Sequence, residues 1–471
     1  METVKNSAIV RFLHSTDFKS KCIKLAILLC FMILGFVAEA FIYIAFASCV
    51  LYVLFEYSAD SLFWIIIAAV YMPYDNASLT FILMWMLSAI LLIKLIIDLK
   101  NKRINFKSWY LITIISLFGA ICLMVLLPLS KTYKFGSQLN KFALFSLVVL
   151  GLIYIKEIKV KNMLLLFASA VAILGLMYYV FTQCNIITTG YMAKYSKGQI
   201  LRFSPFSNDP NFSGAILICA IMAWFIAYKK EFINKYIYFG GMTIGGILVL
   251  MTISKATYFI IALFGLYVLI ENIVITIKTK NAKHLLELVY YLGALLIASI
   301  ICWKYIDSMY QRIFNPSSGW WNEGKQDAGL SNLTTGRTDL WIAYLKVIFN
   351  SPQILLFGAG ADADYIGNGA AHSMPLDYLY RYGILTVIVL VALFIVAVLP
   401  YLKKTKPYNF VPLICITGIF CSIGSVSAKY IYIFTIMFIT LSCNSLNNLQ
   451  VSTDEIITNN QTLQQKKIES N

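Results

Sequence analysis

Residues 161–182 read KNMLLLFASAVAILGLMYYVFT, a run in which Lys161 carries the only charge. A helix crosses a bilayer with roughly 17–25 such apolar residues. The whole chain shares this character, since 60% of its 471 residues are hydrophobic and 13% are charged. A soluble fold cannot hide that much apolar surface. Composition therefore excludes a soluble enzyme, a disordered chain and a fibrous protein, and it predicts an all-α, polytopic integral membrane protein.

About fourteen membrane-spanning helices are predicted, or twelve if one pair among the less regular N-terminal stretches is re-entrant or merged. The stretches are residues 22–38, 40–57, 61–75, 78–98, 108–127, 138–155, 161–182, 211–228, 236–253, 256–277, 286–302, 383–401, 409–424 and 427–443. They divide the chain into a cytoplasmic N-terminus (1–21), eleven helices (22–302), a large external loop (303–382), three helices (383–443) and a flexible cytoplasmic tail (444–471).

Lysine and arginine gather in every second loop between these stretches. Such loops stay in the cytoplasm, so both chain ends are predicted to be cytoplasmic. The same pattern explains the net charge of +16 without nucleic acid as a partner. The basic clusters lie within residues 5–21, 100–107, 156–161, 229–235, 278–284 and 403–406.

His372 is the only one of the three histidines that this topology places outside. Histidine is the side chain best matched to proton transfer near neutral pH, which makes His372 a candidate general base. A loop histidine without a catalytic role is the alternative. The ten cysteines form no CxxC pair and no cluster with histidine, so neither a metal site nor another cofactor is predicted.

Arg337 lies in the sequence TTGRTDLW, residues 334–341, ahead of apolar residues at helical spacing. The arginine therefore falls at a predicted helix N-terminus, where the helix dipole disfavours a cation. A bound anion would reverse that penalty, because free N–H groups and a guanidinium both suit phosphate. A simple pairing of Arg337 with Asp339 remains the alternative.

Residues 183–210 form a second external segment that is basic until Asp209. Asp209 followed by Pro210 is a good helix start, because aspartate caps and proline suits the first helical position. The segment with Arg202 is either an anion-binding mouth or merely a basic loop before a capped helix. Lys255, in the turn between two later spans, is likewise either a third external cation or a snorkelling lysine.

The order of these elements resembles the O-antigen polymerase and O-antigen ligase family of bacterial membrane glycosyltransferases. The resemblance covers about residues 200–400. The family usually has arginine where this chain has Lys255, and asparagine where it has Ser373. The matching elements are Arg202, Asp209-Pro210-Asn211, Ser254-Lys255, Gly336-Arg337 with Trp341, His372 and Gly383.

The resemblance implies a metal-independent transfer of an undecaprenyl-diphosphate-linked oligosaccharide at the external face of the bacterial cytoplasmic membrane, without a cofactor. Under it, His372 is the catalytic base, and Tyr310, Trp320 and Trp321 are candidates to stack on sugar rings. The residues implied in diphosphate binding are Arg202, Arg337 and Lys255, with Asp209, Asn211 and Gly336 in support.

The favoured activity is a polymerase that joins repeat units of a capsular or other surface polysaccharide. A ligase that transfers the glycan to a lipid or protein acceptor is the alternative with the same chemistry. A lipid-linked glycan flippase is the alternative of another class, for which Glu39 and Lys94 are the few candidates for ion coupling. Expected partners are the lipid bilayer and lipid-linked oligosaccharides, together with a chain-length regulator and a flippase.

Overall fold

Every regular element in the described part of the chain is a helix, which confirms the all-α prediction for that part. Several predicted features lie outside it: the spans at 108–127, 138–155 and 427–443, the tail, Gly336, Trp320 and Trp321. The computed structural model describes residues 12, 15, 17–71, 77–101, 160–187, 202–206, 209–280, 282–314, 337–360, 363–366, 371–402 and 407–422.

Four N-terminal helices pack as consecutive hairpins, with α3 against α4 and α4 against α5 and α6. Short connections favour such antiparallel neighbours. The first of these helices starts at Phe18, four residues before the predicted span at 22–38, because the Asp17 carboxylate accepts a hydrogen bond from the Ser20 N–H and caps the helix there. The four helices are α3 (Phe18–Leu34), α4 (Ala40–Phe55), α5 (Ser58–Tyr71) and α6 (Ala77–Lys100).

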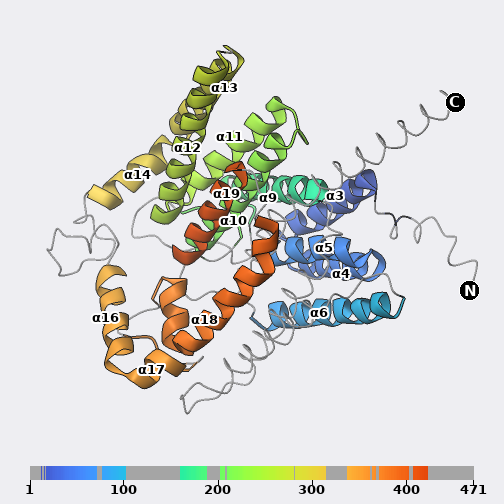
Figure 1. The fold of residues 1–471 in the computed structure, drawn as a ribbon. Helices are drawn as coiled ribbons and strands as arrows, with labels where there is room; N and C mark the ends of the chain where they lie inside the picture. Colours follow the sequence, from blue (N-terminus) through green and yellow to red (C-terminus); the bar gives the residue numbers. More distant parts are fainter. Residues whose placement is uncertain are drawn as a thin grey trace, which may run out of the picture.

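The central helix of the bundle is α10, whose residues are nearly all buried. It contacts α9, α11, α12 and α19 (Figure 1). A helix that is apolar all round is expected to lie inside such a bundle. The helices of this group are α9 (Val160–Gln183), α10 (Pro210–Lys229), α11 (Lys235–Met251), α12 (Lys255–Thr279), α13 (Ala282–Ile301) and α19 (Pro407–Ser422).

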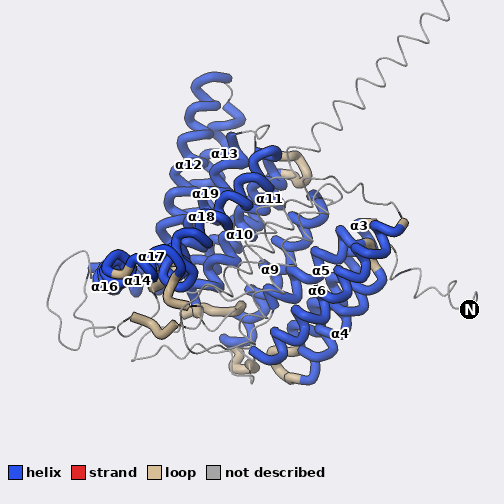
Figure 2. Tube along the Cα trace, turned by 60° about the horizontal axis from the view of Figure 1, so that its bottom comes forward, coloured by secondary structure: helices blue, strands red, loops and turns tan. Residues whose placement is uncertain are grey.

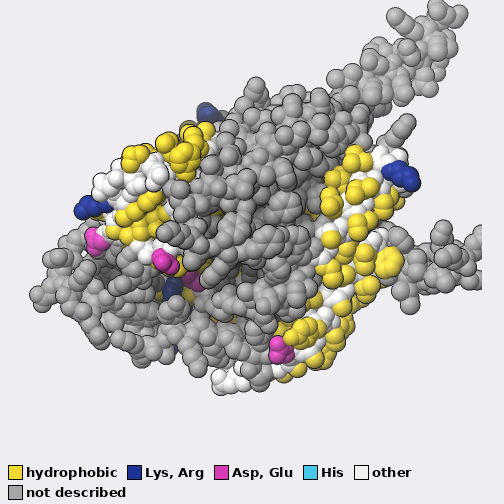
Figure 3. Space-filling view, turned by 90° about the horizontal axis from the view of Figure 1, so that it is seen from below, with side chains coloured by type: hydrophobic (Ala, Val, Ile, Leu, Met, Phe, Trp, Pro, Cys, Tyr) yellow, Lys and Arg dark blue, Asp and Glu magenta, His cyan; other side chains and the backbone are white. Residues whose placement is uncertain are grey.

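Three of the described helices, α9, α10 and α12, are long and apolar enough to cross a membrane. Helices α4 and α11 and residues 288–301 are apolar but shorter. Large apolar side chains also lie on the outside, such as Leu296 and Ile300 of α13, and the described surface in Figure 3 is mainly hydrophobic. Lipid is the solvent that suits such a surface. The total of about fourteen spans stays a prediction.

Contacts between helices define two ends of the bundle. At one end, the Tyr178 ring of α9 meets both Phe36, which follows α3, and Phe203, which precedes α10. At the other end, Lys229 at the end of α10 pairs with Glu271 of α12 at 2.8 Å. We call them the Asp209 end and the Lys229 end, after residues that flank or end α10.

The described residues of the predicted external loop contain three helices and the start of a fourth. Figure 2 shows α14, α16 and α17 gathered beside one end of the bundle. Tyr344, Ile348, Ala371 and Tyr380 form a small core that joins α16 to α18. The elements are α14 (Trp303–Phe314), α16 (Arg337–Asn350), α17 (Pro352–Phe357) and α18 (Met374–Leu402).

Gly383 breaks α18 into two helical parts, because its backbone has φ 72° and ψ 168°. A Cβ at this position would lie 2.4 Å from the Leu356 carbonyl oxygen. Close to this contact, the backbone N–H of Ala359, just after α17, donates to the Tyr380 carbonyl of α18 at 2.7 Å. Only glycine tolerates both the positive φ and this close approach. The joint fixes α17 against the first part of α18, directly after the segment that carries His372.

Candidate functional site

The start of α10 is built by Asp209 and its neighbours. The Asp209 carboxylate accepts hydrogen bonds from the backbone N–H and the side-chain amide of Asn211, both at 2.8 Å. Pro210 occupies the first helical turn, where its missing N–H costs nothing. The sequence prediction of an Asp-Pro helix start is confirmed. The carboxylate is thereby held in one orientation at the Asp209 end.

The start of α12 contacts the start of α10 through Ser254. The Ser254 hydroxyl donates to the Asn211 side-chain oxygen at 2.7 Å, and it also caps α12 by accepting from the Thr257 N–H. Lys255 is the first residue of α12 and is half-buried. In the sequence pair Ser254-Lys255, the serine is therefore the residue that reaches Asn211.

Arg202 lies directly beside the same turn. Its side chain is only 6% exposed, and its Nε donates to the Thr252 carbonyl at 3.1 Å. The next residue, Phe203, is also held against the end of α11, because its N–H donates to the Met251 carbonyl at 3.0 Å. A buried guanidinium at this place is costly unless other groups or a ligand compensate its charge.

Arg337 begins α16, as predicted, and connects it to the end of α19. Its Nη1 donates to the Ser422 carbonyl at 3.1 Å. Burial lowers the pKa of Arg337, and the negative charge of Asp209 opposes that shift. Because charge effects fade with distance, this coupling indicates that α16 brings its arginine close to the start of α10.

His372 lies just before α18 and has a left-handed backbone, with φ 46°. The preceding carbonyl, that of Ala371, accepts a hydrogen bond from the Trp341 indole of α16 at 2.7 Å. Burial lowers the pKa of His372, the Arg337 charge lowers it further, and the Asp209 charge raises it. A lowered pKa keeps the imidazole neutral at neutral pH, which is the form that accepts a proton.

The structure thus brings Arg202, Asp209, Arg337 and His372 to one end of the bundle, although three of them lie on separate helix starts. Two guanidinium groups and one carboxylate lie at this end, so these side chains carry an excess of positive charge that suits an anion. Sequence reasoning missed Thr252 and Ser422, because they contribute backbone carbonyls that have no side-chain signal. The capping role of Ser254 has a weak signal in the sequence, since serine is a common residue directly before a helix.

Within the described residues, no group of three or more His, Cys, Asp or Glu side chains is placed to hold a metal ion. In comparisons with known proteins, no family model, curated protein or solved structure matches the chain.

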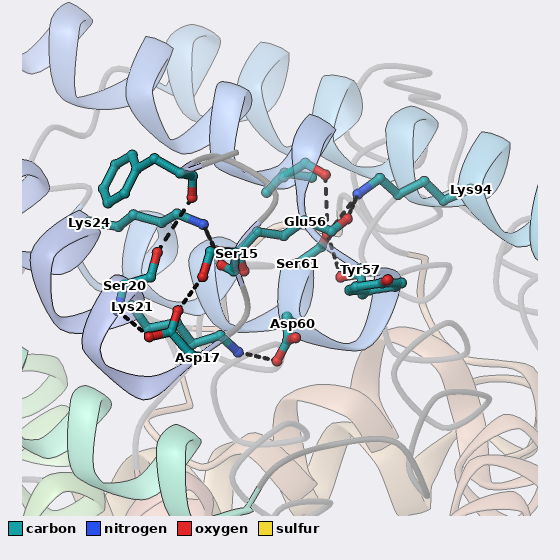
Figure 4. A network of polar contacts seen from close by, with 12 residues as sticks. Ser15, Asp17, Ser20, Lys21, Lys24, Glu56, Tyr57, Asp60, Ser61 and Lys94 are labelled. Carbon is teal, nitrogen blue, oxygen red and sulfur yellow. Dashed lines mark hydrogen bonds and ion pairs between the residues drawn. The ribbon is translucent and has the colours of Figure 1, made fainter. Parts of the chain in front are cut away.

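A second polar cluster lies among the N-terminal helices (Figure 4). Lys21 pairs with Asp60, and Lys24 pairs with Glu56, with all four side chains buried. Lys94 of α6 donates to the Glu56 carbonyl and to the Ser61 hydroxyl. In the sequence analysis, Lys21 was only one of the basic residues that predict a cytoplasmic N-terminus. In the structure it is a buried residue of α3. We call Lys21, Lys24, Glu56, Asp60 and Lys94 the N-terminal charge cluster.

Proposed function

We propose that this protein is a membrane glycosyltransferase that joins undecaprenyl-diphosphate-linked oligosaccharide repeat units into a surface polysaccharide. The observation that carries the proposal is the meeting of Arg202, Arg337, His372 and Asp209 at one end of an apolar helical bundle. Two arginines suit a diphosphate, and a neutral histidine beside them suits a hydroxyl proton.

The arginines act on the donor. Arg202 and Arg337 hold the diphosphate and stabilise the negative charge that builds as its bond to the sugar breaks. Lys255 adds a third cation at the start of α12. Because the diphosphate is already a good leaving group, no nucleotide is needed to drive the transfer.

His372 acts on the acceptor. A sugar hydroxyl of a second lipid-linked unit attacks the anomeric carbon of the donor sugar, and the bond from that carbon to the diphosphate oxygen breaks. His372 takes the hydroxyl proton, and undecaprenyl diphosphate leaves with the bonding electrons. The imidazolium formed in this step is stabilised by the carboxylate of Asp209.

We further propose that the Asp209 end faces the outside of a bacterial cytoplasmic membrane and that both chain ends lie in the cytoplasm. The basic loops support this orientation, since they belong to the Lys229 end of the helices. A flippase and a chain-length regulator are the partners that this activity requires around it, to supply units and to limit their number.

Purified protein supplied with lipid-linked repeat units tests the activity. We expect longer lipid-linked chains without nucleotide and in the presence of a chelator. Extension that stops with the chelator would overturn the metal-independent mechanism. Chain growth that needs a separate lipid or protein acceptor would instead indicate a ligase. Movement of units between leaflets of a vesicle, without extension, would indicate a flippase.

A further inference from the structure

The turn between α11 and α12 contacts Arg202 directly and is connected to Asp209 through Asn211. The turn consists of Thr252, Ile253 and Ser254, which are all buried. Its Thr252 carbonyl accepts from the Arg202 guanidinium, and its Ser254 hydroxyl donates to Asn211, which in turn holds the Asp209 carboxylate. One short turn thus holds the Arg202 guanidinium directly and the Asp209 carboxylate by way of Asn211.

The backbone of this turn is unusual. Ile253 has φ 48°, a left-handed conformation that is rare for a β-branched residue. Such a conformation persists only where the surroundings fix it, and these positions cluster at functional sites. The isoleucine itself is 2% exposed, so its side chain is tightly surrounded. The turn is therefore held in a single shape rather than free to follow its neighbours.

We propose that the Thr252–Ser254 turn sets the positions of Arg202 and Asp209 relative to each other, and that Ser254 is a positioning residue that acts through Asn211. This inference rests on the proposed function. In that reaction, Arg202 holds the donor diphosphate while Asp209 supports the imidazolium of His372. A shift of either group by about 1 Å is enough to slow a transfer step strongly.

The order of the hydrogen bonds makes the role of Ser254 specific. The Asn211 amide has one oxygen and one NH₂ group. Its oxygen accepts from Ser254 at 2.7 Å while its nitrogen donates to Asp209 at 2.8 Å. Without the serine hydroxyl, this amide is free to rotate, and the carboxylate loses a fixed partner on the side of α12.

Two single variants test the chain of contacts. Ser254→Ala removes the donor together with the cap of α12, whereas Asn211→Ala removes the connection and leaves that cap intact. We expect each to lower kcat about tenfold with little change in KM. Ser254→Thr, which keeps a hydroxyl, should recover most of the rate. The matched control is Asn234→Ala, which removes the cap of α11 at the Lys229 end and should leave kcat unchanged.

A double-mutant cycle separates positioning from simple stability. In an Asp209→Asn background, Ser254→Ala should cause little further loss, because it acts through the missing carboxylate. An equal loss in both backgrounds would show that Ser254 only caps α12, and the proposal would be wrong.

A second readout does not need the transferase activity. The pH dependence of modification of His372 by diethyl pyrocarbonate gives the pKa of that residue, in protein whose other two histidines are replaced by glutamine. We expect Ser254→Ala and Asn211→Ala each to lower this pKa, since the Asp209 charge that raises it is less well held. An unchanged pKa in both variants would overturn the positioning role. If wild-type protein extends no chains, the proposed function fails, while this pKa comparison still decides the role of Ser254.

Discussion

The two polar clusters of this protein differ in how their charges are compensated. In the N-terminal charge cluster, Lys21 and Lys24 each pair with a buried carboxylate. At the Asp209 end, Arg202 and Arg337 donate instead to backbone carbonyls. A carboxylate partner supplies an opposite charge to a lysine, whereas a backbone carbonyl supplies only a hydrogen-bond acceptor to a guanidinium. The first cluster therefore joins helices, and under the proposed function the second binds an anion.

The largest expected effect concerns catalysis at the Asp209 end. His372→Ala should slow transfer by about 10²–10⁴-fold, the usual contribution of a positioned base. Cells should accumulate single lipid-linked repeat units and lose the ladder of longer chains on a gel. His284→Ala, in the first turn of α13, is the matched control and should leave the ladder intact. An unchanged ladder in His372→Ala would remove the catalytic role.

The next effect concerns stability at the N-terminal charge cluster. Lys24→Ala leaves Glu56 buried without its partner, which should cost about 3–5 kcal/mol of folding free energy. Replacing both residues, Lys24→Met with Glu56→Leu, should recover most of that loss. Lys229→Ala, which breaks a partly exposed pair with Glu271, should cost at most about 1 kcal/mol.

Thermal unfolding in detergent measures all of these stability variants. If Lys24→Ala is as stable as wild-type protein, the N-terminal charge cluster does not stabilise the fold. The proposed difference between the two clusters would then be wrong.

A smaller stability effect is expected at the joint of α17 and α18. Gly383→Ala places a methyl group against the Leu356 carbonyl in a positive-φ conformation, which should cost about 1–3 kcal/mol. Gly293→Ala in α13 is the control, because a Cβ there meets nothing within 4 Å. That change should be neutral or stabilise by roughly 0.5–1 kcal/mol. Equal unfolding temperatures for the two variants would contradict the role of the Gly383 break.

The smallest effect is a shift in pH dependence. Since the pKa of His372 is lowered, activity should persist below the ordinary histidine pKa of about 6.5. Asp209→Asn removes a charge that raises this pKa, so the acid limb of kcat/KM should move to lower pH. Arg337→Gln removes a charge that lowers it, so the limb should move to higher pH. Shifts of the same sign in both variants would show that these charges do not act on His372.

The sequence predicted the features that depend on local signals. Asp209 and Pro210 mark the start of α10, because capping residues and proline act within a few residues. Gly383 was predicted only as the start of a span, and the helix that precedes it from Met374, with the break at Gly383, was not predicted. Contacts between distant segments had no such signal. Lys21 and Asp60 are 39 residues apart, and the sequence showed only two charges near predicted span ends. The Ser422 carbonyl that receives Arg337 is invisible in sequence, since every residue has a carbonyl.

Donor binding tests the central proposal, that Arg202 and Arg337 together bind the diphosphate of the donor. Binding of undecaprenyl diphosphate to purified protein is measured by native mass spectrometry for wild type and for the double variant Arg202→Ala with Arg337→Ala. Each lost charge-assisted contact is worth roughly 1.5–3 kcal/mol, so the double variant should bind at least about a hundredfold more weakly. Lys346→Ala, at an exposed site on α16, should bind like wild type. Equal binding by wild type and the double variant would contradict the account.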